Sequence, residues 1–470
     1  MLLLLGGASC TKSGSDTPDP TPPVVVTPKG PSQVAFWLTN TDRTALFTKQ
    51  RNVLNFGATA NPFPNITLDT TRTYQTIDGF GYCLTGGSAT VINRMSAASR
   101  ADLLRELFAT DSTWLGVSYL RVSIGASDLD DRVFTYDEVP GDVGLAQFSL
   151  APDRPDLIPV LKQILAINPS IKIMGSPWTA PLWMKSNNAA KGGTLQPQYY
   201  DAYARYFVKY IQQMAAEGIP IDAVTLQNEP LNPYNEPSML MSAAEQANFI
   251  KNNVGPAFAA AGIRTKIIAY DHNPDQPGYA LAVLGDAGAQ PYVEGSAFHN
   301  YGGPLAATLN QVHDAFPTKG LYFTEFWTQA PGNFSTDFPN HVRELEIGAT
   351  RNWAKNVLEW NLANDPAYGP HTPGGCTECL GAVTISGNSI TRNPAYYTVA
   401  HASKFVRPGS VRVDTNSPAN LANVAFRTPA GKKVLLVLNT STSPQQFNIE
   451  YRGKTVATAL AGGSAGTYVW

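Results

Sequence analysis

Eight short β-like segments alternate with helical stretches through the middle of the chain, and this alternation constrains the fold more than any other feature. The helical stretches include 96–108, 199–217 and 243–260, and Gly218 and Gly262 follow two of them as stop residues. The β-like segments are 77–82, 119–124, 171–176, 223–226, 266–270, 295–298, 320–324 and 357–361. Eight strand–helix units within about 330 residues predict an α/β fold, a (β/α)8 TIM barrel.

An open, doubly wound sheet is the alternative fold. It would need a glycine-rich phosphate-binding turn after an early strand. The only candidate turn is 79–84, where Leu84 occupies the position of the third glycine. The barrel is therefore the preferred prediction.

Two β-rich segments flank the central block. Before it, 35–39 and 65–69 have the composition of strands, with no helix between them. After it, short apolar runs separated by turn residues predict strands at 411–413, 424–426, 433–438, 446–449 and 467–470. We predict a β-sandwich side domain built from both chain ends, 33–75 plus 405–470, beside a barrel of 76–404.

The first ten residues resemble the end of a bacterial lipoprotein signal peptide. A short leucine run precedes Gly7-Ala8-Ser9-Cys10, and Cys10 would become the lipidated first residue. The usual basic segment is missing, so either the start is truncated or the match is accidental. Residues 11–32 contain six prolines among Ser, Thr and Asp, which predicts a semi-extended tether. We expect an extracytoplasmic lipoprotein, periplasmic or anchored at the outer membrane and cell surface, that meets the membrane only through this anchor.

Composition narrows the range of partners. The chain has 470 residues and 43% hydrophobic residues, and its 34 Lys and Arg against 36 Asp and Glu give a net charge of −2. Such a chain can bury a large core but offers no basic field for nucleic acid or an anionic membrane. We expect a monomer that binds no nucleic acid. Its many aromatic residues suit core packing and also flat platforms for sugar rings.

Polar and aromatic residues follow the predicted strands. Barrels of this kind place their chemistry at the C-terminal ends of the strands, so these side chains should converge on one mouth. In strand order they are Arg121 and Asp128, Trp178, Asn228 and Glu229, Asp271 and His272, His299 and Tyr301, Glu325 and Trp327, and Trp360 and Asn361.

Glu229 and Glu325 are the candidate catalytic residues. Each follows an apolar β run, and Glu229 is followed by Pro230, which cannot extend a strand ladder. Two glutamates about 5 to 5.5 Å apart would allow one to protonate a glycosidic oxygen while the other attacks the anomeric carbon. The alternative is that Glu229 only caps the following helix. A buried acid/base needs a raised pKa, and a nucleophile needs cationic or hydrogen-bonding neighbours that keep it charged.

Several ordered motifs resemble glycoside hydrolase family 30, a family of retaining (β/α)8 glycosidases, and the resemblance runs from about residue 34 to Trp470. The matching motifs are Asp78-Gly79-Phe80-Gly81, Leu120-Arg121-Val122-Ser123, Gly175-Ser176-Pro177-Trp178-Thr179-Ala180-Pro181, Gln227-Asn228-Glu229-Pro230, Thr324-Glu325 and Trp360-Asn361-Leu362.

The resemblance implies roles for the residues of these motifs. Glu229 would be the acid/base and Glu325 the nucleophile, while Asn228 would bind the sugar 2-hydroxyl and Arg121 would help keep a carboxylate ionised. Asp128, Trp178, Tyr301 and Trp360 would shape the pocket for the cleaved sugar, and His299 and Trp327, at the same strand ends, are further substrate-binding candidates. His299 would donate either to substrate or only to a neighbouring carboxylate.

The resemblance implies a β-1,6-linked glucan as the substrate. The stretch 84–89 and the lipoprotein-like start resemble the bacterial endo-β-1,6-glucanase branch of the family. Other branches cleave glucosylceramide, xylan, or small β-xylosides and β-fucosides. The motifs leave these alternatives, and endo or exo action, open. A non-catalytic glycan-binding protein on the same scaffold is the alternative of another class.

No cofactor or metal is expected. Asp271 and His272 offer only two ligands, so structural hydrogen bonding is the preferred interpretation. Cys376 and Cys379 predict a loop disulfide in an oxidising compartment, although Cys83 would also be near enough to pair with either. His371 leaves a three-cysteine zinc site as a remote alternative.

Overall fold

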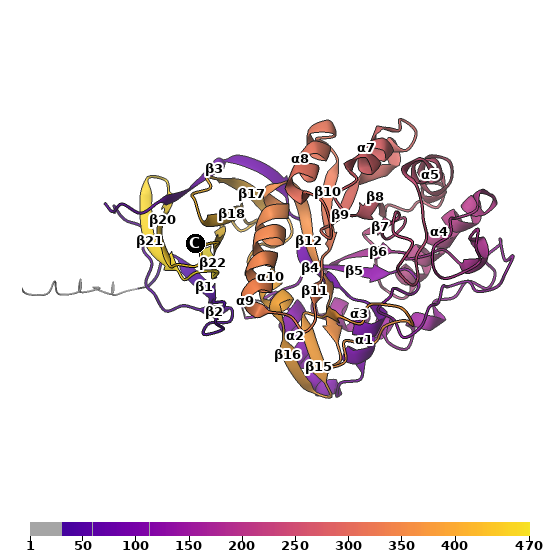
Figure 1. Cartoon of the computed structure of the whole chain (residues 1–470), viewed down its shortest axis with the longest axis horizontal. Helices are drawn as coiled ribbons and strands as arrows, with labels where there is room; N and C mark the ends of the chain where they lie inside the picture. Colours follow the sequence, from indigo (N-terminus) through magenta and orange to yellow (C-terminus); the bar gives the residue numbers. More distant parts are fainter. Residues whose placement is uncertain (1–30, 59, 112) are drawn as a thin grey trace, which may run out of the picture.

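The computed structural model describes residues 31–58, 60–111 and 113–470 (Figure 1). The predicted lipoprotein signal of residues 1–10, with Cys10, and the tether up to residue 30 lie outside the described residues. No helix in the described ranges is both long enough and apolar enough to cross a membrane.

Eight parallel strands close into a barrel, which confirms the predicted fold class. The order around the barrel is β10-β12-β4-β5-β6-β7-β8-β9, so the first and last barrel strands, β4 and β12, are neighbours. The strands are β4 (Gly79–Cys83), β5 (Tyr119–Ser123), β6 (Lys172–Ser176), β7 (Ala223–Thr225), β8 (Lys266–His272), β9 (Val293–His299), β10 (Gly320–Glu325) and β12 (Ala354–Asn361). Each overlaps one of the eight predicted segments.

Helices cover the outside of the barrel. The predicted helix over 243–260 is continuous, but its middle turn has π-helical hydrogen bonding, and a capping box between Ser242 and Glu245 starts it. The helices are α1 (Gly86–Asn93), α2 (Ala97–Phe108), α3 (Leu157–Ile167), α4 (Tyr200–Ala216), α5 (Ala243–Phe249), η4 (Ile250–Val254), α6 (Gly255–Ala260), α7 (Pro277–Gly285), α8 (Leu305–Ala315), α9 (Phe334–His341), η6 (Val342–Ala349) and α10 (Pro394–Ser403).

Side chains inside the barrel form an apolar layer and, nearer the mouth, a polar one. The apolar layer is Tyr119, Met174, Ala223, Ile268, Ala297, Tyr322 and Leu358. Two residues further along four of these strands stand Arg121, Ser176, Thr225 and Thr324, all fully buried. Because side chains alternate along a strand, residues two apart point to the same side. The C-terminal strand ends therefore carry a buried polar floor.

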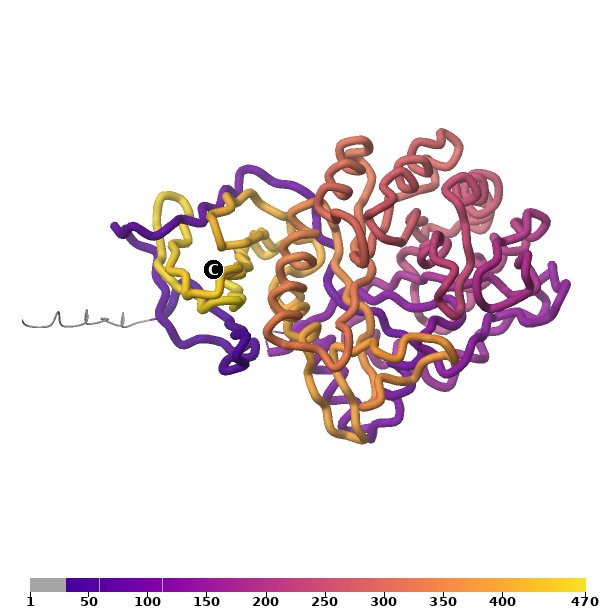
Figure 2. Tube along the Cα trace, in the orientation of Figure 1, coloured from indigo at the N-terminus to yellow at the C-terminus, as the bar shows by residue number. Residues whose placement is uncertain are grey.

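The side domain combines both ends of the chain, as predicted. Figure 2 shows the indigo N-terminal segment beside the yellow C-terminal one. Its strands form one hydrogen-bonded order, β2-β1-β22-β19-β18-β17-β3-β20-β21, in which β1 pairs antiparallel with β22 and β3 pairs with both β17 and β20. They are β1 (Ala35–Thr39), β2 (Thr48–Lys49), β3 (Asn65–Thr76), β17 (Val411–Thr415), β18 (Leu421–Arg427), β19 (Lys433–Asn439), β20 (Gln445–Tyr451), β21 (Lys454–Leu460) and β22 (Ala465–Val469).

A buried histidine joins the two domains. His401 lies on α10, and its ring nitrogens are each 2.8 Å from a threonine hydroxyl of the side domain, Thr467 on β22 and Thr39 on β1. The chain passes from the side domain to the barrel between Thr76 and Gly79 and returns after α10. The side domain is thus attached to the barrel wall, away from the chemistry of the strand ends.

Short elements complete the chain. Two small sheets form beside the mouth, β11 (Thr328–Gln329) with β14 (Cys379–Leu380), and β13 (Ala363–Asn364) with β15 (Val383–Ser386) and β16 (Ser389–Arg392). The 3-10 turns are η1 (Ala151–Asp153), η2 (Leu182–Met184), η3 (Pro197–Tyr199) and η5 (Gln290–Tyr292).

Candidate active site

Glu229 stands where the chain turns out of β7. Its backbone adopts a left-handed conformation with φ of 46°, which residues other than glycine rarely adopt. The carboxylate has a partner on each oxygen. Oε2 accepts hydrogen bonds from the amides of Asn232 and Asn235 at 2.7 and 2.9 Å, and Oε1 lies 3.2 Å from Nδ1 of His299. The turn therefore fixes the carboxylate at the mouth.

Glu229 is not a helix cap. The next helix, α5, begins at Ala243 and is capped by Ser242. The capping alternative for Glu229 is wrong because a loop of more than ten residues separates it from that helix.

Glu325 ends β10. Its Oε2 accepts a hydrogen bond from Nη1 of Arg121 at 2.6 Å, and its Oε1 accepts one from the Tyr301 hydroxyl at 3.0 Å. Nδ1 of His299 lies 3.7 Å from the same Oε1. The residue is 6% exposed, so the carboxylate is reached from the mouth only.

The two candidate carboxylates are close neighbours. An oxygen of Glu229 and an oxygen of Glu325 lie within 4.8 Å of each other. Retaining glycosidases hold their carboxyl groups about 5 to 5.5 Å apart, whereas inverting enzymes leave about 6.5 to 9.5 Å for a water. The spacing matches the retaining arrangement.

Arg121 bonds several groups of the site from inside the barrel. Its Nη2 donates to Oδ2 of Asp271 at 2.7 Å and to Oδ1 of Asn228 at 2.6 Å, while Nη1 holds Glu325. The Arg121 side chain also lies over the Trp178 ring, with 4.8 Å to the centroid. The guanidinium thus contacts two carboxylates, one amide and one aromatic ring.

Asp271, predicted at the end of the fifth strand, is a centre of the hydrogen-bond network. It accepts hydrogen bonds from the hydroxyls of Ser176, Thr225 and Thr324 at 2.7 to 2.8 Å, and it lies 3.2 Å from Nε2 of His299. Burial raises the pKa of Asp271, but the Arg121 charge and the hydrogen bonds outweigh burial and hold that pKa far below its usual range. These hydrogen bonds agree with the structural role expected for Asp271 from the sequence.

Protonation in the unliganded site differs from the expected pattern. Burial raises the pKa of Glu229, but the hydrogen bond and charge of His299 outweigh it and lower this pKa to about 2. Burial raises the pKa of Glu325, against the opposing charges of His299 and Arg121. The His299 pKa rises to about 9, despite burial, because Glu325, Asp271 and Glu229 surround the ring. The proton expected on Glu229 therefore rests on His299, which lies closer to Glu229 than to Glu325.

A small cleft opens above the carboxylates. It has a volume of about 300 Å³, and Trp178 stacks on Trp360 across it, with 5.4 Å between ring centroids. Burial and then the Glu325 charge raise the pKa of Asp128 to about 7. The lining residues are Asp128, Trp178, Glu229, Asn232, Asn235, Asn273, Tyr301, Glu325, Trp327, Trp360, Cys376 and Cys379.

The structure brings all ten predicted catalytic and substrate-binding residues into one region. Seven of them line the cleft. Of the other three, Arg121 and His299 contact the carboxylates, and Asn228 accepts a hydrogen bond from Arg121. Both ring nitrogens of His299 face carboxylates, which favours the carboxylate alternative for this residue. Sequence reasoning missed the asparagines Asn232, Asn235 and Asn273, because loop residues carry no periodic signal.

The structure shows how the cysteines beside the cleft are bonded. Cys376 and Cys379 form a disulfide, and Cys83 is a buried free thiol. The alternative pairings of Cys83 and the three-cysteine zinc site with His371 are therefore wrong. The disulfide closes the loop that leads into β14, which pairs with β11 just beyond Glu325.

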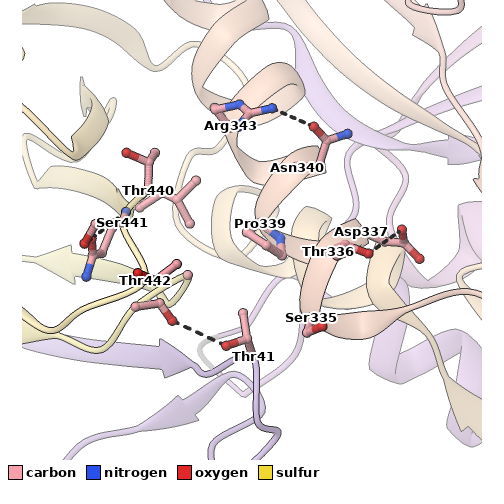
Figure 3. A pocket seen from close by; sticks show the side chains of 14 residues that line it. Thr41, Ser335, Thr336, Asp337, Pro339, Asn340, Arg343, Thr440, Ser441 and Thr442 are labelled. Carbon is pink, nitrogen blue, oxygen red and sulfur yellow. Dashed lines mark hydrogen bonds between the residues drawn. The ribbon is translucent and has the colours of Figure 1, made fainter.

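A larger cavity lies elsewhere, between α9 and the loops of the side domain (Figure 3). Its volume is about 620 Å³, and hydroxyl groups such as those of Ser335, Thr440 and Ser441 dominate its lining. Asp337 is the only carboxylate among its lining residues. A single carboxylate cannot perform the two-carboxylate chemistry, so the smaller cleft is the candidate active site.

The fold is a barrel with a β-sandwich beside it, and two glutamates face each other at the ends of the fourth and seventh barrel strands. These features define a retaining glycoside hydrolase. Comparison with known proteins gives the same class in finer detail. Residues 77–406 match the model of the glycosyl hydrolase family 30 TIM-barrel domain, and residues 409–468 match that of the family 30 beta sandwich domain. The chain belongs to glycosyl hydrolase family 30.

Individual relatives span most of the chain. It is 38% identical over 404 residues to endo-1,6-beta-D-glucanase BGN16.3 of Trichoderma harzianum, covering 80% of each protein. It is 31% identical over 434 residues to the lysosomal acid glucosylceramidase of Mus musculus, covering 86% of this chain and 83% of that protein. The solved structure of the endo-beta1,6-glucanase BT3312 matches with a TM-score of 0.88 and 37% identity, covering 93% and 99% of the two chains.

Proposed function

We propose that this chain is a retaining endo-β-1,6-glucanase. The observation that carries the proposal is the pair of buried glutamates at the mouth, whose carboxylate oxygens lie within 4.8 Å of each other. Relatives described as endo-1,6-β-glucanases, similar over most of the chain, support the choice of glucan and linkage. The presence of both glutamates argues against a non-catalytic glycan-binding protein.

In the first step, Glu325 attacks the anomeric carbon of the bound sugar. The bond from that carbon to the linking oxygen breaks, and the oxygen takes a proton delivered by Glu229. The products are a glycosyl ester on Glu325 and a shorter glucan with a new hydroxyl. Arg121, 2.6 Å from Glu325, orients the attacking carboxylate.

In the second step, Glu229 acts as a base. Its carboxylate takes a proton from a water molecule whose oxygen attacks the anomeric carbon, and the ester bond to Glu325 breaks. Two displacements at one carbon leave the anomeric configuration unchanged. The free sugar end is released as the β anomer.

His299 supplies the proton for the first step. Its Nδ1 faces Oε1 of Glu229 at 3.2 Å, so transfer along that contact produces the protonated acid that the leaving oxygen needs. The ring then stays neutral with its Nε2 on Asp271. The pair holds one shared proton.

Parallel assays on four substrates test the proposal. Pustulan, a β-1,6-glucan, is compared with laminarin, xylan and aryl β-glucosides under identical conditions. We expect mixed β-1,6-linked gluco-oligosaccharides from pustulan early in the reaction, as endo action requires. Activity on xylan alone, on laminarin alone or on aryl glucosides alone would overturn the choice of substrate.

We also propose that Cys10 carries a lipid and that the protein is a monomer outside the cytoplasm. The lipoprotein-like residues Gly7 to Cys10 and the proline-rich 11–32 support the anchor. We expect Cys10→Ser to move the protein from the membrane to the soluble fraction, and light scattering to give the monomer mass. Unchanged membrane association of Cys10→Ser would contradict the anchor.

A further inference from the structure

Metal-binding side chains converge at the catalytic cleft. The sequence offers Asp271 and His272 as two adjacent ligands, and folding brings further ligands beside them. One ligand atom each from Glu229, His299 and Glu325 lies within 4.8 Å of the other two, and all three residues are buried. Carboxylate oxygen and imidazole nitrogen are both ligands that zinc accepts.

The spacing of these donors suits a tetrahedral ion. Zinc bonds of about 2.0 to 2.1 Å to nitrogen and oxygen place tetrahedral ligand atoms about 3.3 Å apart. Nδ1 of His299 lies 3.2 Å from Oε1 of Glu229 and 3.7 Å from Oε1 of Glu325. Small side-chain shifts are enough to place all three donors around one ion.

The remaining atoms of these side chains already have partners. Oε2 of Glu229 accepts from two asparagines, and Oε2 of Glu325 accepts from Arg121. Nε2 of His299 faces Asp271 at 3.2 Å, the carboxylate–histidine contact that orients zinc-binding imidazoles. The Oε1 atoms and Nδ1 are therefore the atoms that can face an ion. Binding releases to solvent the proton that Nδ1 shares with Oε1 of Glu229, and the Tyr301 hydroxyl leaves Oε1 of Glu325.

His272 is a second, independent sign of a ligand. Its Nε2 lies 3.9 Å from Oε1 of Glu229, and its Nδ1 has no hydrogen-bond partner in the described part of the chain. The residue is only 8% exposed. At 3.9 Å, Nε2 is too far from Oε1 of Glu229 for a hydrogen bond, and an ion at Glu229 would give this nitrogen a bond, while Nδ1 on the other side of the ring would stay unpaired.

We propose that the unliganded enzyme binds one Zn²⁺ ion between Glu229, Glu325 and His299, with His272 as a further donor, and that this ion blocks hydrolysis. The carboxylates of Glu229, Glu325 and Asp271 face the charges of Arg121 and His299, and a Zn²⁺ ion that replaces the His299 proton adds one further positive charge to balance them. Substrate and ion occupy the same carboxylates. Inhibition is therefore competitive and reversed by a chelator.

Isothermal titration calorimetry with zinc chloride tests binding directly. The full chain, stripped with EDTA and desalted, should bind one ion per molecule. We expect Glu325→Gln and His272→Gln each to weaken binding at least about tenfold, since even outer-shell changes cost about 10- to 100-fold. His371→Gln, in the loop outside the site, is the matched control and should bind like the wild type. Thermal unfolding of each variant confirms that it is folded.

Inhibition kinetics give a second readout. Added Zn²⁺ should raise KM without lowering kcat, EDTA should restore the rate, and His272→Gln should need about tenfold more Zn²⁺ relative to its own metal-free rate. Cys83→Ser excludes a thiol route if its inhibition is unchanged. The proposal is overturned if the full chain binds no ion, or if Glu325→Gln and His272→Gln bind as tightly as the wild type. Because calorimetry measures zinc binding without a substrate, its result does not depend on which glucan the enzyme cleaves.

Discussion

Nδ1 of His299 lies 3.2 Å from Oε1 of Glu229, and both side chains are buried beneath the cleft. The contact joins the base that holds a proton in the free site to the acid that must deliver it. The pKa of His299 is raised to about 9 and that of Glu229 lowered to about 2, so the two residues titrate as a pair. The site stores its proton one hydrogen bond away from where the reaction uses it.

The pH dependence of kcat/KM should reflect this pair. His299 is protonated below a pH of about 9 and loses its proton above it, so kcat/KM on an aryl β-glucoside should fall as the pH rises through about 9. In His299→Gln, Glu229 must hold the proton itself, and the alkaline limb should move down by at least one pH unit. His371→Gln serves as the control, and an unmoved limb in His299→Gln would rule out the shared proton.

Replacing each glutamate should separate the two roles. Glu325→Gln should lower kcat by about 10³-fold or more on every substrate, because no nucleophile remains. Glu229→Ala should spare formation of the glycosyl ester from aryl glucosides with acidic leaving groups, and added azide should restore turnover of the ester. Circular dichroism checks the fold of both variants, and full activity of Glu325→Gln would refute its assignment as nucleophile.

Asp271→Ala should destabilise the protein strongly. The change leaves the buried Arg121 without one of its two carboxylate partners, and breaking such a pair costs about 3 to 5 kcal/mol. The matched control is Arg72→Ala, which removes the solvent-exposed pair with Asp414 and should cost no more than about 1 kcal/mol. Urea unfolding measures both. Equal losses in the two variants would contradict a structural role of Asp271.

His401 should make stability depend on pH. Burial lowers its pKa from the ordinary 6.5 to about 3, so only the unfolded chain binds its proton between these values. The stability from this neutral ring is present above pH 6.5 and is lost as the pH falls, at about 1.4 kcal/mol per pH unit. Between pH 6.5 and 5 the wild type should lose about 2 kcal/mol more than His401→Gln. Subtracting the unfolding free energies of the two proteins at each pH removes the contribution of other titrating groups. Parallel pH profiles of the two proteins would disprove the expectation.

The barrel is predictable because apolar strand segments alternate with helical stretches. Glu229 and Glu325 could be found since Glu325 ends the apolar strand β10 and Glu229 follows the apolar run at β7 within a few residues. Helix α10 has no such pattern, because every residue from Pro394 to Ser403 is buried and the helix lacks a polar face. Strand β21 was missed because its Ala and Thr residues give a weak alternation.

The protonation of the site could not be predicted from sequence. It depends on His299 lying 3.2 Å from Glu229 but 3.7 Å from Glu325. The amino-acid sequence does not reveal a difference of half an ångström between two distances. The asparagines that hold Glu229 come from a loop whose path is set by tertiary contacts. Sequence motifs identify which groups meet, while the distances among them decide which group carries the proton.

The pairing of β1 with β22 has a consequence for synthesis. Ala35 lies opposite Val469, so strands from the two ends of the described chain form one sheet. All eight barrel strands have left the ribosome once Asn361 has emerged, more than a hundred residues before β22 does. The edge of β1 therefore stays unpaired on that side until almost the whole chain is available, and an unpaired strand edge is a site where chains can aggregate.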